Sequence, residues 1–213
     1  MLVVHHLGKS QSERIVWLCE ELGIPYDLKV YDRDKVTRLA PPEYKKLHPL
    51  GAAPVIHDGD VCIAESGAIV DYIVAKYGNG RLTLKPDHPD FAQYLYWLHF
   101  ANGTFQPATG RNMLLNRLDL PAGNPMLAAM RGRLMLALDS LEARLKANQF
   151  LAGADFTIAD IMIVFTLTTM RLFYAYDLAP YRSILAYLQR IGARPAYQRA
   201  MAKGDPDMKP MLS

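Results

Sequence analysis

Ser10 is the first side chain that could do chemistry, because the segment Ser10-Gln11-Ser12-Glu13 precedes an apolar, helix-forming stretch. Its structural interpretation is a capping box, in which Ser10 caps the helix and Glu13 reaches back to the Ser10 amide. Its functional interpretation is a hydroxyl donor at a helix N-terminus, which would favour a bound thiolate over a thiol with an ordinary pKa of about 8.5. The two roles compete for one side chain, and Ser12 is the alternative donor.

A second chemical feature is the Ala53-Pro54 pair, which lies between a loop and the apolar Val55-Ile56. A proline that opens a strand cannot donate to the strand ladder, and most peptide bonds before proline are trans. In the cis form, the backbone N–H and C=O of Ala53 would be free to pair with an extended peptide ligand, as an added strand does.

A third feature is Glu65-Ser66-Gly67, at the junction between a predicted strand and a predicted helix. Ser66 is expected at the N-cap, and a helix N-terminus with a hydroxyl suits a carboxylate. Glu65 supplies a negative group for an amine, so the pair suits the amino-acid end of a zwitterionic ligand. The alternative interpretation is an ordinary serine cap beside a solvated glutamate.

The elements that position these residues alternate between strand and helix composition over the first 78 residues. Strands are expected at residues 2–7, 27–31, 55–57 and 61–64, and helical segments after Ser10, near 43–47 and at 66–77. The strand-helix-strand unit at the start favours two parallel strands. Asp58-Gly59 between two apolar runs is typical of an antiparallel hairpin. The expected fold of this part is therefore an α/β unit of βαβαββα order with a mixed four-stranded sheet.

The remainder of the chain has helical periodicity and no convincing strand. Residues 79–90 have the composition of a linker, and helices are expected at 90–116, 125–147, 157–175, 181–192 and 195–202. Pro107 is expected to kink or split the first of these helices. Thr157 and Asp160 fit a second capping box, which makes Asp160 a structural residue. The predicted division is a first domain at 1–78, a linker at 79–90 and an all-helical bundle at 91–213.

Composition excludes several classes of function. The 213 residues are 51% hydrophobic and 21% charged, with a net charge of +3 and no lysine- or arginine-rich run, which argues against a nucleic-acid partner. The longest apolar run is interrupted by Asp160 and Arg171, and the N-terminus lacks a signal-peptide pattern, so no membrane association and a cytoplasmic location are expected. His5 and His6 should point to opposite faces of a strand, and no metal site is predicted. Cys19 is expected to be a buried free thiol.

Taken in chain order, these motifs resemble the cytosolic glutathione transferase family of the serine type. The resemblance rests on Ser10 with Arg14, on residues 48–55 (HPLGAAPV), on 65–69 (ESGAI) and on 156–160 (FTIAD). It implies a thioredoxin-like first domain with a cis proline at Pro54, followed by an all-α domain. It further implies glutathione as co-substrate, a homodimer, and conjugation of the glutathione thiolate to small hydrophobic electrophiles.

The resemblance also assigns roles to individual residues. Ser10 corresponds to the catalytic serine, the Ala53-Pro54 backbone to the partner of the cysteinyl part, and Glu65 with Ser66 to the γ-glutamyl subsite. Many relatives carry lysine or glutamine at the position of Ala52, where it reaches the glycyl carboxylate. In this chain either His48, Lys45 or Arg38 takes that role, or no residue does. Residues expected near the electrophile are Tyr96, Phe100, Phe105, Met113 and Tyr174.

Two alternative functions remain open at this point. One keeps the fold and changes the chemistry to glutathione-dependent reduction of disulfides or peroxides, or to isomerisation. The absence of a cysteine near Ser10 disfavours cysteine-based reduction. The other is a non-catalytic protein that binds glutathione or another ligand, which the missing basic residue at Ala52 favours and the Glu65-Ser66 pair disfavours.

Overall fold

The computed structural model describes residues 1–118, 120–121 and 123–213. These residues form two compact units, one of Met1–Thr83 with Gly192–Pro210, and one of Leu84–Ile191 with Met211–Ser213. The first unit thus takes in residues 192–210, which the sequence analysis assigned to the C-terminal domain. Each unit is described by itself.

The first unit is built on a four-stranded sheet of order β2-β1-β3-β4. The strands are β1 (Leu2–Leu7), β2 (Asp27–Tyr31), β3 (Val55–Asp58) and β4 (Val61–Ala64). The pair β1–β2 is parallel, whereas β1–β3 and β3–β4 are antiparallel. The predicted thioredoxin-like arrangement, including the parallel first pair and the hairpin at Asp58-Gly59, is confirmed.

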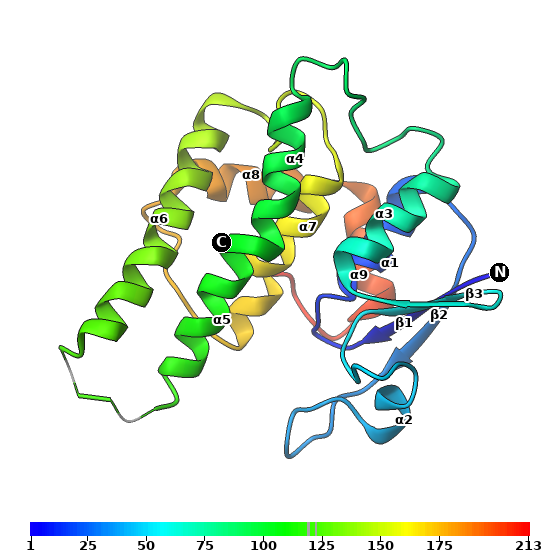
Figure 1. Cartoon of the computed structure of the whole chain (residues 1–213), viewed down its shortest axis with the longest axis horizontal. Helices are drawn as coiled ribbons and strands as arrows, with labels where there is room; N and C mark the ends of the chain where they lie inside the picture. Colours follow the sequence, from blue (N-terminus) through cyan, green and yellow to red (C-terminus); the bar gives the residue numbers. More distant parts are fainter. Residues whose placement is uncertain (119, 122) are drawn as a thin grey trace. The chain divides into compact units, whose positions relative to one another are not determined.

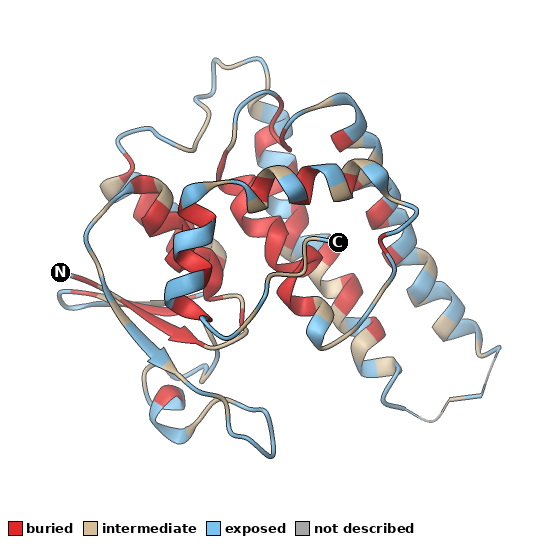
Figure 2. Ribbon diagram, turned by 180° about the vertical axis from the view of Figure 1, so that it is seen from behind, coloured by how far each residue is buried: buried red, intermediate tan, exposed pale blue. Residues whose placement is uncertain are grey.

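Helices cover both faces of this sheet. On one face lie α1 (Glu13–Leu22), α3 (Ser66–Tyr77) and α9 (Pro195–Gly204), and on the other lies the short α2 (Pro42–Lys45) (Figure 1). Buried residues run along β1 and α1 (Figure 2), and Val4, Ile15, Leu18 and Ile56 are fully buried among them. Because side chains alternate across a strand, Leu7 packs toward Tyr44 of α2 while His6 faces the helices α1 and α9.

Helix α9 joins the first unit through contacts with α1. The ring of Trp17 meets the ring of Tyr197 edge-on with centroids 5.0 Å apart. The guanidinium of Arg194 donates to Glu21 with a shortest N–O distance of 2.6 Å, and Arg199 and Lys203 pair with Glu20. Apolar packing combined with partly buried ion pairs explains why this distant segment belongs to the N-terminal sheet unit.

Two helix caps differ from prediction, although α3 spans residues 66–77 as predicted. Helix α1 begins at Glu13, with Ser12 at the N-cap position, and the predicted capping box of Ser10 and Glu13 is wrong. The Glu13 amide donates instead to the Ser10 carbonyl at 3.1 Å, because the Ser10 hydroxyl is occupied by Ser12. Helix α3 begins at Ser66, so the N-cap position is Glu65 rather than Ser66.

The second unit is helical throughout, with no strand among its described residues (84–118, 120–121, 123–191 and 211–213). Its helices are α4 (Phe91–Phe100), α5 (Gln106–Leu115), α6 (Pro125–Ala147), α7 (Ile158–Leu167) and α8 (Arg182–Gly192), with a π-helical turn η1 (Ala101–Phe105) and a 3₁₀ turn η2 (Thr169–Leu172). The π-turn lies just before Pro107, so the predicted break of the first helix is confirmed.

The second capping box is present as predicted. The Thr157 hydroxyl accepts the Ala159 amide at 3.3 Å, and the Thr157 amide donates to Asp160 Oδ2 at 2.9 Å. Asp160 is fully buried and also accepts from the Leu151 amide at 3.0 Å and from the Tyr187 hydroxyl at 3.1 Å. These donors satisfy the buried carboxylate and support a structural role for Asp160.

Among the described residues, no helix combines the length and the apolar character needed to cross a bilayer. Cys19 is fully buried, as expected, and burial raises the pKa of its thiol well above the ordinary range. Cys62 is exposed.

Candidate active site

Ser10 lies in the connection between β1 and α1 and is nearly buried, with 5% of its surface exposed. Its Oγ lies 2.7 Å from Oγ of Ser12 and accepts the Ser12 amide at 3.2 Å. The Ser12 hydroxyl in turn accepts the Leu7 amide at 3.1 Å and lies 2.9 Å from Nδ1 of His6. The sequence left Ser10 and Ser12 as alternatives, and the structure places them in direct contact with each other.

The imidazole of His6 connects this serine pair to the C-terminal segment of the first unit. Its Nε2 lies 3.1 Å from Oδ2 of Asp205, just after α9, and both residues are buried. The other carboxylate oxygen of Asp205 accepts the Lys9 amide at 2.9 Å. Gly204 lies against the imidazole, and a Cβ at this position would be 3.1 Å from Nε2. The close approach of ring and backbone therefore favours glycine, because a side chain here would press on the imidazole.

A second chain of hydrogen bonds joins the Ala53 and Ser66 segments. The Gln11 side-chain amide donates to the carbonyl oxygen of Ala53 at 3.0 Å, and the Gln11 Oε1 accepts from Arg14 Nη1 at 2.9 Å. The same Arg14 nitrogen donates to the Ser66 hydroxyl at 3.0 Å. Arg14 is fully buried, and this burial lowers the pKa of its guanidinium. Gln11 and Arg14 therefore fix the relative positions of two predicted ligand-binding segments.

The Ala53-Pro54 peptide bond is cis, as the resemblance implied. The carbonyl of Ala53 already accepts one hydrogen bond, from Gln11, which differs from the expectation that it is free. A carbonyl oxygen has two lone pairs, so one acceptor position remains for a ligand.

Glu65 is exposed and has a φ of 71°, which is unusual for a residue other than glycine. Such a backbone conformation costs on the order of 1–3 kcal/mol and is found most often at ligand sites. Here it brings Glu65 out of β4 and directly before the first turn of α3.

The residues considered for a ligand carboxylate lie in the loop region around α2. Ala52 is exposed and His48 is half-buried, with its Nδ1 accepting the Leu50 amide at 3.3 Å. Lys45 packs against Gly51, whose φ of 57° suits the absence of a side chain. Among the described residues, no hydrogen bond joins these side chains to Ser10.

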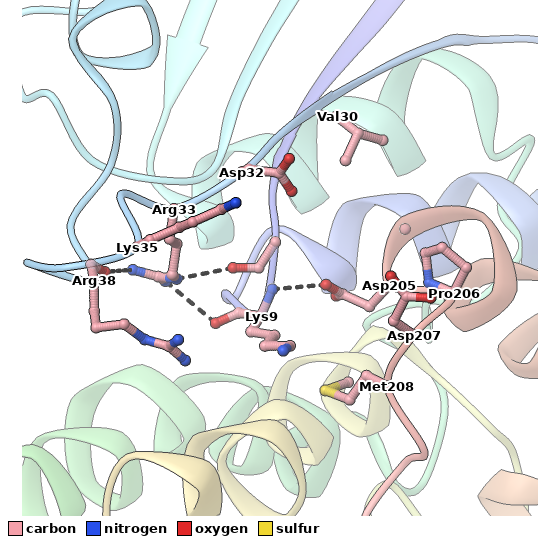
Figure 3. A pocket seen from close by; sticks show the side chains of 12 residues that line it. Lys9, Val30, Asp32, Arg33, Lys35, Arg38, Asp205, Pro206, Asp207 and Met208 are labelled. Atoms are coloured by element: carbon pink, nitrogen blue, oxygen red, sulfur yellow. Dashed lines mark hydrogen bonds between the residues drawn. The ribbon is translucent and has the colours of Figure 1, made fainter.

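Arg38, unlike His48, lines a pocket of about 350 Å³ in the first unit. Figure 3 shows the guanidinium of Arg33 on one wall, where it donates to the carbonyls of Gly8, Lys9 and Arg38. Asp205 lies on another wall beside the Lys9 backbone (Figure 3). The pocket carries four basic side chains and three acidic ones, and these are Lys9, Arg33, Lys35 and Arg38 with Asp32, Asp205 and Asp207.

His5 and His6 point to opposite faces of β1, as predicted. The His5 ring lies 2.9 Å from the Tyr31 hydroxyl and 2.9 Å from Nδ1 of His57. Burial, followed by the charges of His57 and Lys29, lowers the pKa of His5 to about 4. Within the described residues, no group of three histidine, cysteine or acidic side chains gathers in the manner of metal ligands.

Of the five residues expected near an electrophile, two belong to the core of the second unit. Phe100 and Phe105 are 7% and 0% exposed, because they point into the packed helices, whereas Tyr96 is 54% exposed. Met113 and Tyr174 are half-buried.

Sequence reasoning missed three residues of this site: Gln11, His6 and Asp205. No sequence pattern identifies Gln11 as a site residue apart from its position between two serines. The alternation of β1 placed His6 opposite His5, but its partner Asp205 is 199 positions away. No local pattern identifies such a pair.

Comparison with known proteins gives a consistent result for both parts of the chain. Residues 1–75 match the family model for the glutathione S-transferase N-terminal domain, and residues 124–190 match the model for the C-terminal domain. Glutathione S-transferase 3 of Schizosaccharomyces pombe is 33% identical over 95% of this chain and 88% of that protein. Glutathione S-transferase 3 of Zea mays is 30% identical over 89% of this chain and 87% of that protein. The crystal structure of a glutathione S-transferase from Actinobacillus pleuropneumoniae has a TM-score of 0.88, is 33% identical, and covers 96% of this chain and 93% of its own.

Proposed function

Because this chain belongs to the glutathione S-transferase family and uses glutathione as its co-substrate, we propose that Ser10 is the residue that stabilises the glutathione thiolate. The enzyme is a transferase. Its similarity to named transferases gives no reason to prefer reduction, isomerisation or ligand binding alone over transfer. The role of Ser10 is supported by its position directly before α1, where backbone N–H groups and the helix dipole favour an anion.

The observation that carries the proposal is the hydrogen-bond chain from Ala53 through Gln11 and Arg14 to Ser66. In this site the cysteinyl backbone of glutathione pairs with Ala53 next to Pro54. The γ-glutamyl carboxylate meets the N-terminus of α3 and Ser66, and its amine meets Glu65. The chain that joins these segments passes through Gln11, the neighbour of Ser10, and so holds both ends of one peptide ligand in register.

The glycyl carboxylate requires a cation or a neutral donor in place of the missing side chain at Ala52. We assign it to the loop region around α2, with His48 as the first residue to test and Lys45 and Arg38 as the alternatives. His48 is half-buried and follows α2, and Lys45 packs on the neighbouring Gly51. Arg38 lines the pocket beside Lys9.

The roles that we propose for the two domains are those of the family. We propose that residues 1–78 bind glutathione, that 79–90 link the two parts, and that 91–213 contribute the surface for a small hydrophobic electrophile. A homodimer in the cytoplasm is the proposed state, with no nucleic-acid or membrane partner.

The experiment that tests the site is glutathione binding by calorimetry, followed by an ultraviolet thiolate scan across pH. The wild-type enzyme should bind glutathione saturably and form thiolate well below pH 8.5, the ordinary pKa of a free thiol being about 8.5. Ser10→Ala should raise the pKa of the bound thiol while S-methylglutathione, which has no thiol, still binds. An unchanged thiol pKa in Ser10→Ala would remove Ser10 from this role, and no binding at millimolar glutathione would overturn the proposed site.

A further inference from the structure

We propose that the buried pair His6–Asp205 is the base that takes the proton of the glutathione thiol, and that the hydroxyls of Ser10 and Ser12 carry this proton to it. The proposal rests on the proposed role of Ser10, and it adds three residues that act through Ser10. Only Ser10 touches the thiol. Ser12, His6 and Asp205 determine where its proton goes and in which direction the Ser10 hydroxyl points.

The geometry is an unbroken chain of hydrogen bonds. The Oγ–Oγ distance from Ser10 to Ser12 is 2.7 Å, the Ser12 Oγ lies 2.9 Å from His6 Nδ1, and His6 Nε2 lies 3.1 Å from Asp205 Oδ2. All four residues are buried, with at most 7% of their surface exposed. Ser10, Ser12 and His6 are therefore shielded from bulk water, whereas Asp205 also lines the pocket beside Lys9. Each proton position within the chain is set by the neighbouring groups.

Before the thiol reacts, the numbers of donors and acceptors on these side chains determine which residue donates in each hydrogen bond of the chain. A neutral imidazole that faces a carboxylate through Nε2 carries its proton there, so Nδ1 is an acceptor. The Ser12 hydroxyl then donates to His6 Nδ1, which is closer than its other acceptor, the Leu7 carbonyl at 3.3 Å. This bond uses the one hydroxyl proton of Ser12, so Ser12 is the acceptor in its other contacts. It accepts from the Leu7 amide and from the Ser10 hydroxyl.

In this direction the proton of Ser10 points into the protein and not toward a ligand. Ser10 accepts the Ser12 amide, and the contacts of the described residues leave it one acceptor position. A thiol S–H fits that position. A thiolate does not, because it needs a donor.

Transfer of one proton along the chain reverses each hydrogen bond from the thiol to His6 Nδ1 and leaves the bond from His6 Nε2 to Asp205 in its original direction. The S–H bond of glutathione breaks and its proton joins Ser10 Oγ, the former Ser10 proton joins Ser12 Oγ, and the former Ser12 proton joins His6 Nδ1. The products are a thiolate and an imidazolium, so the net charge is unchanged. Ser10 now donates to the thiolate, Ser12 donates to Ser10, and the imidazolium donates to Ser12 and to Asp205.

Charged and polar groups contact His6 from several sides. Asp205 provides the opposite charge in direct contact, and the Lys9 amide holds its second oxygen in place. Arg33 interacts electrostatically with Asp205 from the β2–α2 connection and offsets part of that negative charge. Gly204 packs against the ring from α9, Ser12 contacts it from the start of α1, and His5 on the same strand points to the opposite face.

The decisive experiment compares the thiol pKa of bound glutathione in Ser12→Ala, Asp205→Asn and His6→Gln with the wild type, by ultraviolet titration. Each variant should raise that pKa by about one unit, which is about tenfold less thiolate at a fixed pH below it. Because the residues act as one chain, the double variant Ser10→Ala/Asp205→Asn should show no larger shift than Ser10→Ala. His5→Gln, a buried histidine on the other face of β1, is the matched control and should leave the thiol pKa unchanged.

Folding is controlled by the affinity for S-methylglutathione, which uses the same subsites and has no proton to transfer. If a variant fails to bind it, ¹⁵N NMR of His6 in the wild-type enzyme decides the matter. The His6 imidazole should become protonated on binding glutathione and stay neutral on binding S-methylglutathione. A neutral His6 in both complexes would overturn the relay.

The failures of the two proposals are distinguishable. If Ser10→Ala raises the thiol pKa and the other three variants do not, the relay is wrong and the role of Ser10 stands. If Ser10→Ala has no effect on the thiol pKa, the proposed function of Ser10 fails and the relay fails with it.

Discussion

The side-chain amide of Gln11 donates to the carbonyl of Ala53 across 42 positions of sequence, from 3.0 Å. Gln11 thereby anchors the segment that precedes Pro54 to the start of α1, next to Ser10. Replacing it with leucine removes this bond and the acceptor that Gln11 Oε1 provides for Arg14. Glutathione binding should weaken at least about fivefold, since each hydrogen bond contributes about 1 kcal/mol. Calorimetric titration with glutathione measures the change. Gln198→Leu is the matched control, because Gln198 also donates to a backbone carbonyl, that of Gly192, but on α9. Equal affinities of the two variants would contradict a specific role for Gln11.

Arg14 should be sensitive even to a substitution that keeps its charge. Arg14→Lys leaves a buried cation with fewer donors than the guanidinium that reaches Gln11 and Ser66. We expect the free energy of unfolding to fall by about 2–4 kcal/mol, measured by urea denaturation. Arg81→Lys, at an exposed arginine that donates to the Gly78 carbonyl, should change it by less than about 0.5 kcal/mol. A similar small loss for both variants would show that Arg14 is not a buried support of the site.

His5 should make the protein less stable in weak acid. Its pKa is lowered to about 4 in the folded protein, from an ordinary value of about 6.5 in the unfolded chain. Between these values the unfolded chain binds a proton that the folded protein does not, so stability falls as the pH drops from about 6.5 to about 4. The slope contributed by one proton is at most about 1.36 kcal/mol per pH unit.

His5→Gln should remove this contribution and flatten the dependence of unfolding free energy on pH within that window. Urea denaturation at several pH values provides the measurement. His99→Gln, at an exposed histidine of α4, should retain the wild-type slope. Parallel curves for the wild type and His5→Gln would contradict the lowered pKa.

Asp160 should be costly to replace, because it is a fully buried and hydrogen-bonded carboxylate. Its carboxylate accepts from two backbone amides and the Tyr187 hydroxyl, all buried. Asp160→Ala leaves these donors without their acceptor and should lower the free energy of unfolding by about 3–5 kcal/mol. Thr157→Ala, which removes the other half of the capping box, should cost about 1 kcal/mol. Asp177→Ala is the control, because Asp177 accepts the Ala179 amide at an exposed site. Comparable losses for Asp160 and Asp177 would refute the assignment.

The two capping-box motifs explain how far the sequence could be interpreted. Ser10-x-x-Glu13 and Thr157-x-x-Asp160 have the same pattern, yet only the second forms the box. The Thr157 hydroxyl accepts the Ala159 amide, and its other contact is the Asp160 carboxylate of the same capping box. The Ser10 hydroxyl is instead bound by Ser12, which is held in turn by Leu7 and His6. Local pattern therefore predicts a cap only where tertiary contacts leave the side chain available.

Two of the strand pairings followed from local signals, whereas the pairing of β1 with β3 and the connections within the site did not. The Asp58-Gly59 turn and the strand-helix-strand spacing indicate these two pairings, because turn chemistry and short connections act over a limited stretch of chain. The bonds from Gln11 to Ala53 and from Arg14 to Ser66 depend on the packed structure, since the partners are 42 and 52 positions apart. The side chains of Gln11 and Arg14 can form hydrogen bonds with many kinds of residue, so the sequence alone does not identify their partners.

The inclusion of residues 192–210 in the first unit has a consequence for biosynthesis. The ribosome completes β1 long before it adds Asp205, 199 positions later than His6. Domains generally fold from the N-terminus as synthesis proceeds, but this one cannot close over His6 until α9 has emerged. Until then the face of α1 that carries Trp17 has no cover from Tyr197. The nascent sheet unit thus exposes this apolar face until α9 has been synthesised, and the proposed thiol-activating site cannot be complete before Asp205 is added.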